Sequence, residues 1–143
     1  MASLWRSLLG SDTMSIAKDS VVTLIMGFST QAKKLQVNDR IRGYQNSYIT
    51  ILDVSTRKEA AISLFLDDGT SLCVSKQQPV FTANGWKQAD QLVEEEWLCG
   101  QEENVYYEIK KITLISETEL IHIQSMEVGS YLANGIVLAA DVG

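Results

Sequence analysis

The sequence predicts an all-β domain with an internal duplication, and three observations lead to this prediction. Short apolar or alternating runs recur along most of the 143 residues, with Gly, Asn and Asp turn signals between them. The tripeptide Ala-Asn-Gly follows two of these runs, beginning at Ala83 and at Ala133. Residues 35–43 also line up with residues 92–100, at an offset of 57 residues. Together these patterns favour a barrel-like or sandwich-like β domain with two similar halves.

The expected elements follow one another from residue 21 onwards. Gly27 closes a β-branched run, and Asp68-Gly69 provides a hairpin turn further along the chain. Pro79, the only proline, fits the first residue of a strand because it has no N–H for a central ladder. A single helical turn is expected over 86–93. Besides the two Ala-Asn-Gly hairpins, strands are expected at 21–26, 34–44, 48–54, 61–66, 71–74, 106–115 and 120–124.

The strongest local signal is the last hairpin, which spans residues 130–140. Asn134-Gly135 lies between two apolar runs, as in a type I′ turn, which requires positive φ at both central positions. The second run, 136–138, is apolar enough to be buried on both faces of a sheet. We therefore expect this hairpin to lie at the centre of the domain, and the offset of 50 residues between the two Ala-Asn-Gly turns implies an extra hairpin in the first half.

The composition argues against several classes of function. A net charge of −6 with only 12 Lys and Arg residues is unsuited to a surface that binds nucleic acid. No apolar run approaches the roughly 18 residues of a membrane span. Cys73 and Cys99 each lie among apolar residues, which favours buried free thiols over a disulfide. The chain fits one domain with a real core, and we expect neither a metal nor a cofactor.

Four stretches resemble, in order, the sequence blocks of inteins. They are SIAKDSVVTLIMG (15–27), KLQVNDRIRGY (34–44), VSKQQPVFTANGWKQADQL (74–92) and ELIHIQSMEVGSYLANGIVLAA (119–140). The chain is thus similar to a Hint domain, the fold shared by hedgehog autoprocessing domains and inteins, and more specifically to a mini-intein. The resemblance implies an all-β horseshoe with pseudo-two-fold duplication. No homing endonuclease is expected, because the space between Leu98 and Tyr107 admits only a short loop.

The resemblance also implies a chemistry and a place for each catalytic group. In the family, a hydroxyl or thiol at the first intein residue attacks the preceding carbonyl in an N-to-O or N-to-S acyl shift, and preorganised donors stabilise the oxyanion. Ser15 stands at that first position. Ser75 and Gln78 stand where a later block has its Thr and its His, which act on the scissile amide. Gln78 can still donate a hydrogen bond to a carbonyl, although it can equally be a turn residue.

The closing block keeps its hairpin but departs from the family in its chemistry. Ala139 and Ala140 occupy the positions of the closing His and Asn, and Asp141 occupies the position of the second nucleophile. His122, the only histidine, lies between two isoleucines. A lone histidine there is usually a core residue, yet family members place an Asp, His or Cys at this position near the junction. His122 is therefore also a candidate acid–base group.

The resemblance divides the chain into three parts. Residues 1–14 are expected to be a leader or N-extein remnant, in which 4–9 have helical spacing, and residues 15–140 the splicing element, with 141–143 a C-extein remnant. We expect these flanking segments as partners in cis, in a monomer without nucleic-acid or membrane partners and located in the cytoplasm within a host protein. Residue 140 should lie within a few ångströms of residue 15.

The expected function is that of a mini-intein trapped before the last step of splicing. Two alternatives remain open at this stage. The chain can be a Hint domain that cleaves itself without ligation, or a degenerate Hint-like module with a binding or structural role.

Overall fold

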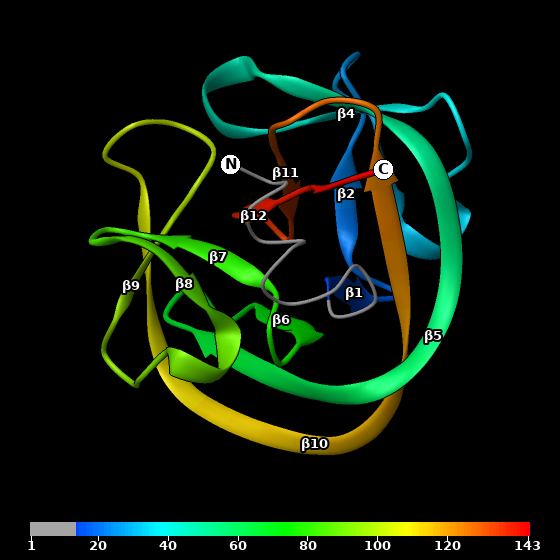
Figure 1. The fold of residues 1–143 in the computed structure, drawn as a ribbon. Helices are drawn as coiled ribbons and strands as arrows, with labels where there is room; N and C mark the ends of the chain where they lie inside the picture. Colours follow the sequence, from blue (N-terminus) through cyan, green and yellow to red (C-terminus); the bar gives the residue numbers. More distant parts are fainter. Residues whose placement is uncertain (1–13) are drawn as a thin grey trace.

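Two long antiparallel strands, β5 (Tyr48–Leu66) and β10 (Tyr106–Ser125), form the frame of the molecule. The computed structural model describes residues 14–143. The two strands pair along most of their length, from Ile109 opposite Leu66 to Ser125 opposite Ile51. Figure 1 shows both strands curving around the shorter strands, which gives the molecule its horseshoe outline. The all-β fold expected from the sequence is confirmed.

Each frame strand is one continuous element, whereas the sequence analysis divided each of them into two. The predicted breaks at 55–60 and 116–119 are wrong. Both segments are rich in polar residues and lack a buried apolar face, so their sequence is typical of a loop. They remain extended because each has the other as a hydrogen-bonding partner, with one register shift between Ile115 and Thr118. Ladder hydrogen bonds need a neighbouring strand and do not require burial of the side chains.

The shorter strands fill the interior of the horseshoe. Eleven strands belong to one sheet, and β2 and β3 form a separate hairpin. Strand β1 pairs with β10 on one side and with β6 on the other, and β13 pairs with β10 in parallel. The short strands are β1 (Ser15–Ala17), β2 (Val21–Thr23), β3 (Ser29–Gln31), β4 (Arg40–Arg42), β6 (Ser71–Ser75), β7 (Pro79–Thr82), β8 (Gly85–Gln88), β9 (Trp97–Cys99), β11 (Ser130–Ala133), β12 (Ile136–Ala139) and β13 (Asp141–Val142).

Within residues 14–143, three single turns of 3₁₀-helix connect these strands: η2 (Ala32–Lys34), η3 (Tyr44–Asn46) and η4 (Ala89–Gln91). They correct two expectations. The strand expected over 34–44 is mostly a turn and a loop, because Asn38 has a φ of +75° and interrupts the extended chain; only β4 is a strand. The helical turn expected over 86–93 is shorter, since β8 occupies its first part and η4 the rest.

The internal duplication is visible in the order of the elements. The β2–β3 hairpin, η2, β4 and β5 recur as the β7–β8 hairpin, η4, β9 and β10. Asn38 and Glu95 lie in equivalent loops, and both have positive φ, at 75° and 73°. This order equates the Asn84-Gly85 hairpin with β2–β3. The Ala-Asn-Gly repeat therefore marks two hairpins with different positions in the fold, and the equivalence drawn between them from the sequence is wrong.

The hairpin β11–β12 lies in the core, as expected. All four residues of β11 and all four of β12 are buried. Its turn has positive φ at Asn134 (50°) and at Gly135 (84°), as a type I′ turn requires. A core cluster formed from strands of both halves surrounds it. Both cysteines are free, although Cys73 is only half-buried, and burial raises the pKa of both thiols.

The helix suggested for residues 4–9 lies outside the described residues. In the described residues, no helix has the length and apolar character to cross a membrane.

Candidate functional site

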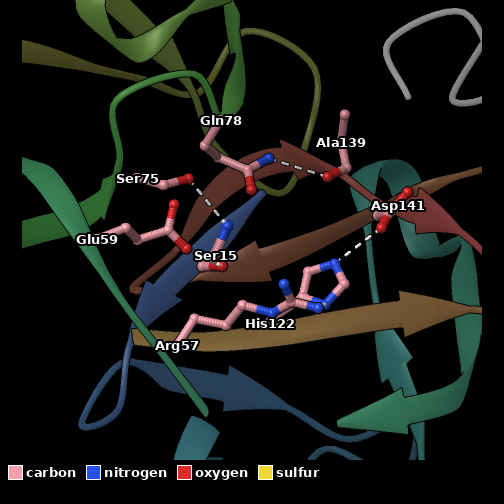
Figure 2. Close-up of polar contacts among 8 residues, drawn as sticks. All are labelled: Ser15, Arg57, Glu59, Ser75, Gln78, His122, Ala139 and Asp141. Carbon is pink, nitrogen blue, oxygen red and sulfur yellow. Dashed lines mark hydrogen bonds and ion pairs between the residues drawn. The ribbon is translucent and has the colours of Figure 1, made fainter. Parts of the chain in front are cut away.

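The structure gathers the predicted site residues at one place inside the horseshoe, and Figure 2 shows all of them except Ala140. Strand β1 places Ser15 directly opposite His122 of β10 and beside the end of β6, where Ser75 lies. Strands β12 and β13 bring residues 139–141, which we call the closing segment, to the same place. All seven predicted residues are buried: Ser15, Ser75, Gln78, His122, Ala139, Ala140 and Asp141. Residues far apart in the sequence thus share one enclosed site.

Ser15 begins β1, and both its backbone N–H and its hydroxyl donate hydrogen bonds. Its backbone N–H donates a hydrogen bond to the Oγ of Ser75 over 3.0 Å, and its own Oγ donates one to Oε2 of Glu59 over 2.9 Å. The residue is fully buried, and so is Met14 before it. The nitrogen of the amide between Met14 and Ser15 is therefore held by the hydroxyl of Ser75. Ser15 carries a second hydroxyl close to this amide, on its own Cβ.

Gln78 binds the closing segment. Its Nε2 donates hydrogen bonds to the carbonyl oxygens of Pro79 and Ala139, each over 3.0 Å. Neither acceptor is the carbonyl of the amide before Ser15, on which the resemblance implied that this position acts. Its Oε1 is buried and has no hydrogen-bond partner among the described residues. Gln78 thus connects the start of β7 to the end of β12.

His122 and Asp141 form a buried pair. Nε2 of His122 lies 2.8 Å from Oδ2 of Asp141, and both residues are almost completely enclosed. Nδ1 of the same ring faces Nη2 of Arg57 at 3.5 Å. A guanidinium can only donate, so Nδ1 accepts and Nε2 carries the proton that it donates to Asp141. His122 is therefore a buried residue with polar partners, and it lies beside the closing segment as the resemblance implied.

Tyr131 lies in β11, and the Asp141 carboxylate acts on it electrostatically. Its burial raises the pKa of the phenol, and the charge of Asp141 raises this pKa further. The ring therefore remains neutral at physiological pH.

Sequence reasoning missed two polar residues of the site, Arg57 and Glu59. Both belong to β5, and their spacing of two places them on the same face of the strand. The sequence analysis assigned 55–60 to a break between strands. The sequence carries no signal for them, because residues 55–59 are all polar. The alternation of half-buried positions 55, 57 and 59 with exposed positions 56 and 58 appears only in the structure. Within residues 14–143, no three His, Cys, Asp and Glu side chains are grouped as metal ligands would be.

Two curved frame strands, two similar halves and a first strand paired beside the closing segment define the Hint fold, and the described chain has the Hint fold of mini-inteins. Its overlap with the gp41-1 intein has a TM-score of 0.76 at 24% sequence identity and covers 87% of this chain and 96% of that one.

Two DnaB inteins overlap this chain equally well. The match to the Ssp DnaB mini-intein variant M86 has a TM-score of 0.78 at 20% identity and covers 90% of this chain and 95% of that one. The match to a DnaB intein from Synechocystis sp. PCC 6803 has a TM-score of 0.79 at 19% identity, with 90% and 99% covered. No protein-family model and no curated protein matches the sequence. The similarity thus concerns the fold.

Proposed function

We propose that this chain is a protein-splicing element of the mini-intein type that carries out the first step of splicing and is arrested before the last. One observation carries the proposal: the N–H of Ser15 donates to Ser75 Oγ over 3.0 Å, at the start of a strand that lies beside the closing segment. The Hint fold shared with solved inteins supports it. In this proposal residues 15–140 are the splicing element, and 1–14 and 141–143 are its flanking segments in cis.

The first step is an N-to-O acyl shift at the bond between Met14 and Ser15. Ser15 Oγ attacks the Met14 carbonyl carbon, the bond from that carbon to the Ser15 nitrogen breaks, and an ester with a free amine results. Ser75 contributes by fixing the orientation of the scissile amide through its N–H. Because both residues are buried, the reacting groups are held in place before the reaction starts.

The two later steps, acyl transfer to residue 141 and cyclisation at residue 140, lack their reactants. Cyclisation needs a side-chain amide at residue 140, and Ala140 has only a methyl group. Ala139 has no group that exchanges a proton. Asp141 is engaged with His122, and its carboxylate is a poor substitute for the hydroxyl or thiol that would take over the acyl group. The ester therefore reverts to the amide or is resolved by another nucleophile.

Hydroxylamine tests the acyl shift, because it attacks esters readily and amides hardly at all. We expect it to release residues 1–14 as a hydroxamate and leave 15–143, a result that mass spectrometry measures directly. Ser15→Ala should abolish the cleavage, while Ser71→Ala, which changes an exposed serine outside the site, should leave the rate unchanged. Gln78 carries no charge to polarise the amide, so the cleavage should be slow. Equal resistance of the unmodified protein and Ser15→Ala would favour a binding or structural module instead.

Cleavage without ligation is the second candidate function, and the chemistry of residue 141 favours it. With a carboxylate in place of a second nucleophile, water is the remaining acceptor for an acyl group on Ser15. Intact mass of fresh and aged protein separates the candidates. A stable full-length mass supports the arrested element, whereas spontaneous loss of residues 1–14 supports self-cleavage.

A further inference from the structure

Within the described residues, Ser15 Oγ donates its hydrogen bond to the carboxylate of Glu59. The donor and acceptor atoms, Ser15 Oγ and Glu59 Oε2, are 2.9 Å apart. The hydroxyl belongs to a completely buried residue, so solvent does not compete for its proton. In Figure 2 the Glu59 side chain extends from β5 towards Ser15. This contact joins a carboxylate to the atom that must lose a proton if Ser15 is to act as a nucleophile.

The other polar groups of the site are directed elsewhere. His122 is bonded to Asp141 through Nε2 and faces Arg57 through Nδ1, so both of its ring nitrogens are engaged. Ser75 Oγ receives the N–H of Ser15. The Gln78 amide is not a base, and its Nε2 is bonded to two carbonyl oxygens. Among these groups, the Glu59 carboxylate is therefore best placed to accept the Ser15 hydroxyl proton.

Strand β5 places Glu59 between the buried serine and the outside of the molecule. A cavity of about 260 Å³ opens beside it, lined by Glu59, Ala60, Lys76, Gln77 and Asp90. Glu59 is half-buried, with one side towards Ser15 and the other towards this cavity. A group in this position can exchange protons with solvent while it holds the hydroxyl in a fixed orientation.

Building on the acyl shift proposed above, we propose that Glu59 is the general base that activates Ser15. The Ser15 hydroxyl proton passes to Glu59 Oε2 while a bond forms from Ser15 Oγ to the Met14 carbonyl carbon. When the bond from that carbon to the Ser15 nitrogen breaks, the proton held by the Glu59 carboxyl group is passed on to this nitrogen, which becomes an amine. One proton moves and no further reactant is needed.

Two variants at this position test the proposal by the hydroxylamine assay. Glu59→Gln keeps the shape but removes the base, and we expect cleavage to slow by about 10²-fold or more. Glu59→Ala should be equally slow, but it leaves space next to the open cavity. Added formate, a small carboxylate, should enter this space and raise the rate of Glu59→Ala at least tenfold, saturating with concentration. Glu59→Gln, which leaves no such space, should not respond to formate.

Controls keep this inference separate from the acyl shift itself. Glu119→Gln changes an exposed carboxylate on β10 that lies near Lys18, and it should cleave at the unmodified rate. Circular dichroism should show that all variants are folded. If the unmodified protein resists hydroxylamine, the acyl shift is refuted. If the unmodified protein cleaves and Glu59→Gln cleaves at the same rate, or if formate fails to accelerate a folded Glu59→Ala, the role of Glu59 is refuted and the acyl shift stands.

Discussion

At the scale of single residues, Gln78 has hydrogen-bond partners other than the one that the resemblance implied. The resemblance places it where a histidine would act on the scissile amide before Ser15. In the structure its amide nitrogen instead spans the carbonyl groups of Pro79 and Ala139. A side chain with two donors on one nitrogen can satisfy two buried carbonyls at once, which an imidazole ring cannot do from one atom. Gln78 thus stabilises the closing segment.

Gln78→Ala should therefore destabilise the fold. It removes two buried hydrogen bonds, leaves the Ala139 carbonyl without this partner and opens a small cavity. We expect the free energy of unfolding to fall by about 2–4 kcal/mol, measured by urea denaturation. Gln77→Ala, one residue away and half-buried, should change it by no more than about 0.5 kcal/mol. Equal stability of the two variants would show that the contacts of Gln78 contribute nothing.

The site residues divide by what makes them predictable. Ser15, Ser75 and Gln78 were located because each has a fixed place within a short sequence block. Arg57 and Glu59 were missed because their position depends on the register of β5 against β10, which is set over many residues of pairing. The hydrogen bond of Gln78 to Ala139 was likewise beyond the sequence, since it joins positions 61 residues apart. A local pattern identifies a position in a block but does not identify its partners.

At the scale of elements, two glycines show different reasons for the absence of a side chain. Gly135 has a φ of +84° in the β11–β12 turn, and a Cβ there would meet no atom within 4 Å. Gly43 has an ordinary φ of −126°, but a Cβ there would lie 2.3 Å from the backbone oxygen of Ser130. The first glycine is needed for its backbone conformation, and the second for the close approach of the chain to β11.

Replacing these glycines by alanine should give different losses of stability. Gly135→Ala has the cost of a left-handed conformation for an L-residue, about 1 kcal/mol. Gly43→Ala must displace a backbone segment and should lower the free energy of unfolding by about 2–3 kcal/mol. Thermal or urea unfolding of both variants provides the comparison. A larger loss for Gly135→Ala would contradict the packing of β11 described above.

The order and number of strands were only partly predictable at this scale. The hairpin turns at Asp68-Gly69 and Asn134-Gly135 were correct because turn chemistry is local. The frame strands were divided wrongly because their polar middle segments have no apolar face to reveal them. The polar middle of each frame strand is extended because it pairs with the other frame strand. The local sequence of one strand does not reveal which segment pairs with it.

At the scale of the whole molecule, the fold fixes the backbone of residues 140 and 141. Ala140 is fully buried, and its N–H donates to the Gly129 carbonyl over 3.0 Å, so its backbone is fixed. Asp141 continues directly into β13, which is paired with β10. In the proposed function, the backbone is thus held at the point where side chains at positions 140 and 141 would react. This is the proximity that cyclisation requires.

Restoring those side chains should restore the late chemistry. In a chain with different tags at its two ends, Ala140→Asn together with Asp141→Ser should give cleavage at the closing junction and spliced product, even with Gln78 unchanged. Loss of Asp141 also frees His122 to act as an acid–base group, so adding His122→Ala should slow the reaction by about 10²-fold. Gel analysis over days at neutral pH follows the tags. Asp141→Ser alone is the control and should not cleave there; if the tags of the restored chain also stay together, the splicing proposal is wrong.

Strand β10 holds both Ser15 and Asp141, since His122 lies opposite one and is bonded to the other. Any polypeptide joined at these two positions would therefore leave and re-enter the domain at neighbouring points. For the surrounding protein, this domain would act as an inserted loop. The entropy cost of closing that loop would resemble that of a short connection, although well over a hundred residues lie between positions 15 and 141. Because that entropy depends on the distance between the ends, the folded insertion would perturb the surrounding protein far less than an unstructured loop of the same length.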